Sequence, residues 1–175
     1  MYSRNRNNAI YFQHFSTFIE FTCDRNGHVI VYIDGACPGN GTHGARGGIG
    51  VWFGDHHPLN VSEPLGRQES HYAGPTNQVA EIKAAIKACE ILRNYGVKRT
   101  AIFTDSQYLI DSITKWIYTW LNNGWQTYQG QPVVHKALYE ELLYWIEDFE
   151  RVEWTHVPSH CNKADPLAKM GAESY

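Results

Sequence analysis

The sequence lacks the features that mark several protein classes. Its 175 residues hold four cysteines without a CxxC pair, so their spacing matches no zinc module and favours reduced thiols in an intracellular protein. No apolar run approaches the length of a membrane span. A basic composition is also missing, because the formal net charge is -3 with the nine histidines counted as neutral. Any attraction to nucleic acid must therefore come from a local patch or from bound cations.

The chain does have enough apolar content for a folded core. Hydrophobic residues make up 43% and charged residues 19% of the sequence, which excludes a disordered composition, and the length suits one domain. We divide it into an N-terminal arm, residues 1–27, and a globular domain, residues 28–175. The arm has no acidic residue before Glu20 and is rich in aromatic side chains. It is expected to be either an organellar presequence or an additional arm that is at most partly ordered.

The hydrophobic pattern of the globular domain predicts an α/β fold. Strands are expected at 28–34, 49–53, 59–65, 100–105 and 151–156. Helices are expected at 76–95, 113–121 and 133–149, with shorter ones after Ser106 and after Asp165. Three sequential strands predict an antiparallel meander, and the helical crossovers predict parallel additions. The pattern therefore predicts a five-stranded mixed sheet, with three antiparallel strands plus two parallel ones, flanked by helices.

Three acidic residues occupy positions that an ordinary surface charge would not. Asp34 and Asp105 each end an apolar strand, and parallel pairing of these strands would bring both to the edge where open α/β sheets place their sites. Glu81 shares a helical stripe with Ala85 and Leu92, so it should face the sheet. A buried carboxylate must be protonated, ion-paired or bound to metal. Taken singly, each aspartate is equally consistent with a helix cap, and Glu81 with an ion pair, although no basic partner stands out.

Convergence of the three carboxylates predicts a cation site. Carboxylates at one sheet edge repel each other unless a cation lies between them. Oxygen ligands alone select hard cations, chiefly Mg²⁺ or Mn²⁺. Two such ions can activate a water molecule and stabilise the leaving oxygen in phosphodiester hydrolysis. The residues thus point to a metal-dependent nuclease.

Four sequence blocks resemble those of the type 1 ribonuclease H family, in the matching order and with likeness to its eukaryotic members. The blocks are Val31–Gly35, Thr76–Glu81, Thr104–Ser106, and His156–His160 with Ala164–Ala168. This resemblance implies a ribonuclease H-like fold over residues 28–173. It implies an endonuclease that hydrolyses the RNA strand of RNA/DNA hybrids with two Mg²⁺ ions, for which Mn²⁺ can substitute, and leaves 5′-phosphate and 3′-hydroxyl ends. The expected partner is the hybrid, without a membrane, and the expected state is a monomer.

The resemblance also assigns residues to the site. Asp34, Glu81, Asp105 and Asp165 match the family's four metal-binding carboxylates, and His160 matches a loop histidine that assists product release or proton transfer. Positions that match the lining of the minor groove, where 2′-hydroxyls are read, are Cys37, Gly39, Asn40, Asn77 and Gln78. Positions that match contacts to the DNA strand are Thr76, Tyr108, Trp116 and Trp120. Without the family, the two tryptophans are as consistent with packing between helices, and His160 with an ordinary surface histidine.

The last block departs from the family pattern. His160 and Asp165 are only five positions apart (165 − 160 = 5), a shorter connection than the family usually has. Pro166 then restricts the residue before it, since that residue is pushed away from helical geometry, although proline is tolerated in a first helical turn. The short connection puts the reach of His160 and the position of Asp165 in question.

Basic side chains are fewer than the resemblance implies. Gly74 stands two positions before Thr76, where the family often has arginine, and the segment after Lys115 contains little positive charge. We therefore expect reduced hybrid affinity and a weak dependence of binding on salt. No separate hybrid-binding domain is recognisable in residues 1–27, so distributive cleavage is also expected.

Two other functions remain open at this point. The first is a hybrid-binding module of the same fold with little or no catalysis, which the short connection favours. The second is an integrase- or transposase-like nuclease, which Asn40, Asn77 and Gln78 disfavour because they suit recognition of 2′-hydroxyls. The compartment is left open among nucleus, cytoplasm and mitochondrion.

Overall fold

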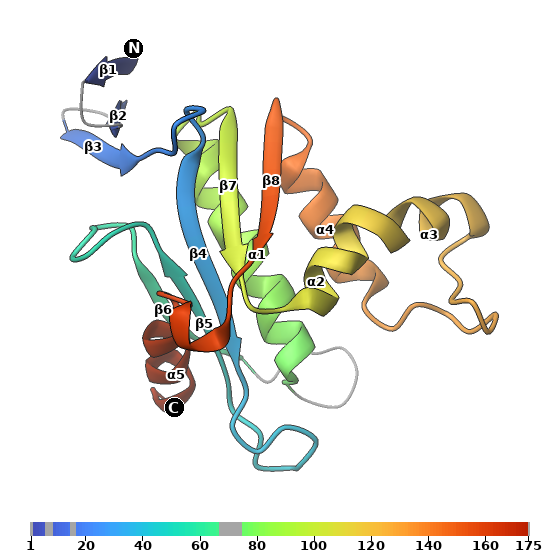
Figure 1. Ribbon diagram of the computed structural model, residues 1–175. Helices are drawn as coiled ribbons and strands as arrows, with labels where there is room; N and C mark the ends of the chain where they lie inside the picture. The colour runs from blue at the N-terminus through green and yellow to red at the C-terminus, as the bar shows by residue number, and fades with distance from the viewer. Residues whose placement is uncertain (1, 6–8, 15–16, 67–74, 175) are drawn as a thin grey trace.

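A five-stranded mixed sheet forms the centre of the structure (Figure 1). The computed structural model describes residues 2–5, 9–14, 17–66 and 75–174. The strands are β4 (Val29–Ala36), β5 (Gly47–Trp52), β6 (Val61–Leu65), β7 (Arg99–Thr104) and β8 (Arg151–His156). Their order is β6-β5-β4-β7-β8; β5 is antiparallel to β4 and β6, whereas β7 runs parallel to β4 and β8 parallel to β7. The predicted arrangement of three antiparallel strands plus two parallel ones is confirmed.

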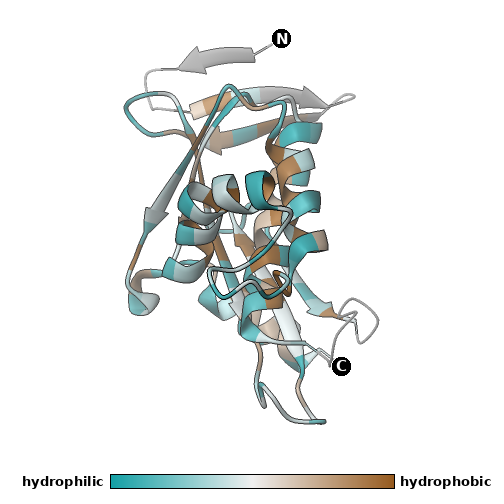
Figure 2. Ribbon diagram, turned by 90° about the vertical axis from the view of Figure 1, so that its right-hand side faces the viewer, coloured by the Kyte–Doolittle hydropathy of each residue, from teal (hydrophilic) through white to brown (hydrophobic). Residues whose placement is uncertain are grey.

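Helices cover both faces of this sheet. They are α1 (Asn77–Asn94), α2 (Gln107–Asp111), α3 (Ile117–Asn123), α4 (Lys136–Ile146) and α5 (Asp165–Glu173), with a π-helical turn η1 (Ser112–Trp116) and a 3-10 turn η2 (Ser159–Cys161). The helices bury apolar faces and keep polar faces outward (Figure 2). In the described part of the chain, no helix has the length and apolar character needed to cross a membrane.

Two glycines set how closely helices approach the sheet beside the predicted site. A Cβ atom at Gly35 would collide with the backbone of Glu81 in α1, and a Cβ atom at Gly50 would collide with the backbone of Ala164 at the start of α5. Gly50 pairs with Asp34 across β4 and β5. Because successive residues of a strand point to opposite faces, α1 and α5 pack on opposite faces of the sheet. Both helices are thereby brought close to the part of β4 that carries Asp34.

The N-terminal arm contains strands that the sequence analysis did not predict. They are β1 (Tyr2–Asn5), β2 (Ala9–His14) and β3 (Thr17–Thr22), and they form a separate antiparallel sheet. Ile19, Phe21 and Cys23 are buried, while the residues between them are exposed. The ring of Phe21 lies 5.3 Å from that of Phe53. The end of the arm is therefore part of the hydrophobic core.

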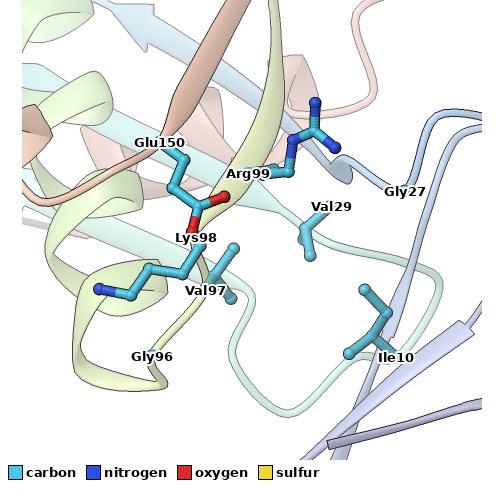
Figure 3. Close-up of a pocket in the computed structure, with 8 residues that line it drawn as sticks. All are labelled: Ile10, Gly27, Val29, Gly96, Val97, Lys98, Arg99 and Glu150. Carbon is cyan, nitrogen blue, oxygen red and sulfur yellow. The ribbon is translucent and has the colours of Figure 1, made fainter.

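A shallow pocket of about 230 Å³ lies where the arm meets the central sheet (Figure 3). It is lined by Ile10, Gly27, Val29, Gly96, Val97, Lys98, Arg99 and Glu150. Val29 begins β4 and Arg99 begins β7. Since Asp34 and Asp105 lie at the other ends of these strands, the pocket is at the opposite end of the sheet from the predicted site.

Candidate active site

Three carboxylates converge at one edge of the central sheet. Asp34 lies near the end of β4, Asp105 directly follows β7, and Glu81 is in the second turn of α1. One carboxylate oxygen of each lies within 4.8 Å of the others. The parallel pairing of β4 with β7 carries both aspartates to the same edge, and the close approach of α1 at Gly35 adds the glutamate. The structure thus brings together the three residues that the strand ends and the helical stripe single out.

The electrostatics of the cluster are those of crowded, buried acids. Burial, and then the charge of Asp105, raises the pKa of Asp34 to about 7. Burial and the charges of both aspartates hold the pKa of Glu81 well above its usual range. Burial acts in the same sense on Asp105, but hydrogen bonds from Ser159 and Asn162 outweigh it, so the pKa of this carboxyl is lowered. Without a cation, Asp34 therefore keeps its proton to near neutral pH while Asp105 is ionised.

Asp165 lies beside this cluster at the first position of α5. Its charge contributes to the raised pKa of Asp34, and its Oδ2 forms an ion pair with Lys169 Nζ at 2.8 Å, one turn along the helix. Pro166 falls in the first turn, where its missing N–H is tolerated, so α5 begins at Asp165 despite the proline. The short connection keeps the fourth acidic residue near the others, although outside the tight group of three.

Asn162 is a residue of the site that the sequence analysis missed. Its amide is buried and lies within hydrogen-bond distance of Asp34 and Asp105. Hydrophobic periodicity predicts residues on helices and strands, and therefore could not single out an asparagine in an irregular turn. The one available signal was its place in the short connection between His160 and Asp165, which has to cross the carboxylate edge.

Comparison with known proteins identifies the family. A family model described as RNase H matches residues 26–173. The chain belongs to the ribonuclease H family. Members of this family depend on divalent metal ions, and an all-carboxylate donor set fits such ions because they prefer oxygen ligands.

Individual relatives show the extent of the match. Ribonuclease H1 of Mus musculus is 41% identical over 151 residues, which are 83% of this chain and 50% of the mouse protein. The chain therefore spans about half the length of the mammalian relatives it matches. Ribonuclease H of Actinobacillus pleuropneumoniae is 35% identical over 152 residues, which are 83% of this chain and 91% of the bacterial protein.

Among solved structures, the foamy viral protease-reverse transcriptase in complex with an RNA/DNA hybrid has a TM-score of 0.62 and 25% identity. The match covers 83% of this chain and 20% of the viral chain.

The glycine-rich loop after β4 meets the start of α1 in this ribonuclease H fold. Asn40 Oδ1 accepts a hydrogen bond from the backbone N–H of Asn77 at 3.3 Å, and Cys37 Sγ donates to the carbonyl of Pro75 at 3.2 Å. Gly39 has a left-handed φ of 73°, which glycine adopts without strain. Cys37 is buried, whereas Asn40 and Asn77 are exposed. Polar side chains are thus held at the surface by a loop that is tied to the helix.

The first turn of α1 carries two more residues matched by the resemblance. Thr76 caps the helix, since its Oγ1 accepts a hydrogen bond from the N–H of Val79 at 3.2 Å. Gln78 is exposed, and its Oε1 lies 3.3 Å from Nε2 of His135. Gly74, the position where an arginine was expected by resemblance, lies outside the described residues.

The three matched aromatic residues divide into two kinds. Tyr108 and Trp116 are 40% and 38% exposed, and their ring centroids are 5.3 Å apart. Trp120 is only 7% exposed and packs against Tyr139 at 5.3 Å and Trp125 at 6.1 Å. Tyr108 and Trp116 therefore offer a surface, while Trp120 supports it from the core.

His160 lies on the exposed turn η2. Its neighbour Ser159 is a hydrogen-bond donor to Asp105, so the turn touches the site through the serine. The structure therefore places His160 on the solvent side of a turn that borders the site.

A second group of potential ligands occurs among the described residues, near the pocket of Figure 3. It consists of Asp24, His28 and Glu153. Asp24 Oδ1 accepts hydrogen bonds from the backbone N–H groups of Asn26 and His28, both at 2.8 Å, and His28 Nδ1 lies 3.0 Å from Asp24 Oδ2. These bonds use Asp24 and Nδ1 of His28 to shape the turn before β4.

Proposed function

We propose that this chain is an endonuclease that hydrolyses the RNA strand of RNA/DNA hybrids and leaves 5′-phosphate and 3′-hydroxyl ends. The observation that carries the proposal is the convergence of Asp34, Glu81 and Asp105 within 4.8 Å in a fold of the ribonuclease H family. Carboxylates that repel each other at one sheet edge favour chemistry on a polyanionic ester when cations neutralise them.

The cations proposed for this site are two Mg²⁺ ions, with Mn²⁺ as a substitute. Asp34, Glu81 and Asp105 would hold them, with Asp165 beside the cluster. When bound, the ions supply the activation of the attacking water and the stabilisation of the leaving 3′-oxygen. Thr104 Oγ1, at 3.4 Å from Glu81 Oε2, holds the glutamate toward the two aspartates.

Recognition of RNA is proposed for the loop after β4 and the first turn of α1. Asn40, Asn77 and Gln78 present amide groups that both donate and accept hydrogen bonds, as a 2′-hydroxyl requires. Their exposure and the hydrogen bond from Asn77 N–H to Asn40 support one continuous recognition surface. The related viral structure that contains an RNA/DNA hybrid supports the choice of substrate.

Contact with the DNA strand is proposed for Thr76, Tyr108 and Trp116. The rings of Tyr108 and Trp116 lie edge to face at 70° and are both partly exposed, which supports contact with a sugar or a base. His160, at the rim, is proposed to assist proton transfer or product release, without contacting the carboxylates.

Cleavage of matched substrates tests the proposal. The chain should cut a hybrid in the presence of Mg²⁺ and leave duplex DNA and duplex RNA intact, and Asp34→Asn and Asp105→Asn should each abolish cutting. Tight hybrid binding without cutting would favour a hybrid-binding module instead, for which the short connection between His160 and Asp165 is the supporting observation.

A further inference from the structure

Asn162 stands in the turn between η2 and α5 and is only 5% exposed. Its Nδ2 lies 2.9 Å from the carbonyl oxygen of Ile33, 3.1 Å from Asp105 Oδ1 and 3.3 Å from Asp34 Oδ1. One amide group thus meets acceptors from the ends of two neighbouring strands. A buried amide is costly unless its hydrogen bonds are made, so this position is specified by its partners.

The orientation of the amide follows from those partners. Asn162 Oδ1 accepts a hydrogen bond from the backbone N–H of Ala164 at 3.1 Å, and that N–H can only donate. The Ile33 carbonyl can only accept. A reversed amide would set its oxygen against one carbonyl and two carboxylates, and its NH₂ group against an N–H. Asn162 therefore acts as a donor to the carboxylates and not as a ligand of a cation.

The same side chain links the site to the last helix. Asn162 accepts a hydrogen bond from the N–H of Ala164, which is the residue directly before Asp165, where α5 begins. The chain crosses from β8 to α5 in few residues, since only five positions separate His160 from Asp165. Asn162 lies in the middle of this crossing, at the point where the chain passes the two strand ends.

We propose that Asn162 is a positioning residue of the metal centre. It holds Asp34 and Asp105 in a fixed mutual orientation and sets the start of α5 against them, so that Asp165 faces the cluster in spite of the short connection. This inference rests on the proposed nuclease function. Hydrogen bonds to ligating carboxylates fix their orientation, and their removal typically lowers metal affinity or activity about 10- to 100-fold.

The test is Asn162→Ala, with Asn60→Ala as the matched control. Asn60 also uses its amide to bridge main-chain groups, accepting from the N–H of Phe53 and donating to the carbonyl of Gly54, both at 2.8 Å, but it contacts no carboxylate of the cluster. For Asn162→Ala we expect kcat to fall about 10- to 100-fold and the half-saturating Mg²⁺ concentration to rise about tenfold, with KM for the hybrid unchanged. Asn60→Ala should lower the melting temperature while leaving kcat and the Mg²⁺ requirement as in the parent.

A second variant, Asn162→Asp, keeps the shape and the acceptor for Ala164 but loses the donor. It should lose kcat as Asn162→Ala does. If either variant at position 162 folds and keeps the parental kcat and Mg²⁺ requirement, the positioning role is wrong. Calorimetric titration with Mn²⁺ separates this inference from the function itself. If the parent binds Mn²⁺ but cuts no hybrid, the nuclease proposal fails, while weaker Mn²⁺ binding by Asn162→Ala still supports the positioning role and unchanged binding overturns it.

Discussion

Asp34 holds its proton more tightly than an ordinary aspartate, because burial and the neighbouring Asp105 disfavour its charge. Its pKa is about 7 in the folded chain, against 3.8 for an isolated carboxyl. The stability that this preference contributes is fully present below pH 3.8 and is lost as the pH rises through about 7. Metal-free protein should therefore be less stable above neutral pH than at mildly acidic pH as far as this residue is concerned.

The melting temperature in EDTA, compared between the parent and Asp34→Asn, isolates that effect. An amide cannot ionise, so the advantage of the variant over the parent should be several degrees larger at pH 8 than at pH 5, where the folded parent still keeps the proton. One pKa unit is worth about 1.4 kcal/mol, and 1 kcal/mol shifts the melting temperature by about 2–4 °C in a chain of this size. Saturating Mg²⁺ should raise the melting temperature of the parent more at pH 8 than at pH 5. A gap between parent and variant that stays the same at both pH values contradicts the assignment of the raised pKa to Asp34.

At the residue scale, the sequence was sufficient to predict those residues of the site whose positions follow from regular secondary structure. Asp34 and Asp105 could be brought together because strand ends and a helical crossover predict a shared edge, and Glu81 because its helical stripe is apolar. Asn162 could not be found in this way, since its role depends on how an irregular turn passes the strand ends. The position of Asp165 beside the group of three carboxylates, and not within it, likewise depends on where α5 begins.

At the element scale, the packing of α1 on β4 determines whether Glu81 reaches the aspartates. Gly35→Ala would force the two backbones apart, because the added Cβ atom would collide with the backbone of Glu81. We predict a loss of about 1–3 kcal/mol in the free energy of unfolding, as for other overpacked sites, together with a raised Mg²⁺ requirement for cleavage. Urea unfolding and a Mg²⁺ titration of activity measure the two effects.

Gly44→Ala is the matched control for this change. The nearest atom to a Cβ at Gly44 is Thr42 Oγ1 at 3.9 Å, which is ordinary contact. If Gly35→Ala unfolds at the same urea concentration as Gly44→Ala and keeps the same Mg²⁺ requirement, the tight contact of α1 with β4 does not set the site.

The helix between β7 and α4 places two tryptophans in different environments. Trp116 lies at the end of the π-helical turn η1 and is exposed beside Tyr108, whereas Trp120 lies in α3 and packs in the core. The sequence predicts a helix over 113–121, but nothing in it marks the π-helical turn, because hydrophobic periodicity does not resolve one wider turn. Sequence spacing alone therefore does not distinguish the exposed ring of Trp116 from the buried ring of Trp120.

Alanine substitutions should separate the two tryptophans. Trp120→Ala should cost about 3–5 kcal/mol of stability, as expected for a large core side chain. Trp116→Ala should keep most of the stability and raise KM for the hybrid about tenfold, since stacking on a nucleic acid is worth about 1–3 kcal/mol. Urea unfolding and steady-state kinetics give both quantities. The reverse pattern, with stability lost at Trp116 and KM raised at Trp120, would overturn the assignment of the aromatic surface.

At the scale of the whole molecule, the central sheet followed from the order of strands and helices, while the N-terminal sheet did not. The arm carries the alternation of a half-buried strand, with Ile19, Phe21 and Cys23 buried and the residues between them exposed. That alternation is present in the sequence, but the aromatic residues of the arm and its lack of acidic residues before Glu20 are equally typical of a targeting segment. β1, β2 and β3 pair as sequential hairpins, but the sequence between them contains no glycine, which is the usual signal of a tight hairpin turn.

The way in which the molecule engages a long substrate is a further prediction. The proposed hybrid contacts come from one domain with a mildly acidic overall charge, so each encounter should be brief. We expect distributive cleavage of long hybrids. In an assay with end-labelled hybrid and an excess of unlabelled trap added after binding, the products should correspond to about one cut per encounter. A ladder of several cuts from one encounter would show that the chain stays bound and moves along the hybrid.

The function proposed for the carboxylate cluster is cleavage of the RNA strand of a hybrid with the help of divalent metal. Its most direct test is cleavage of one sequence presented as RNA/DNA hybrid, duplex RNA and duplex DNA, with Mg²⁺ and with EDTA, by the parent, Asp34→Asn and Asp105→Asn. We expect Mg²⁺-dependent cutting of the hybrid alone, with 5′-phosphate ends, and its loss in both variants. Cutting that survives in EDTA or in either variant, or equal cutting of all three duplexes, would contradict it.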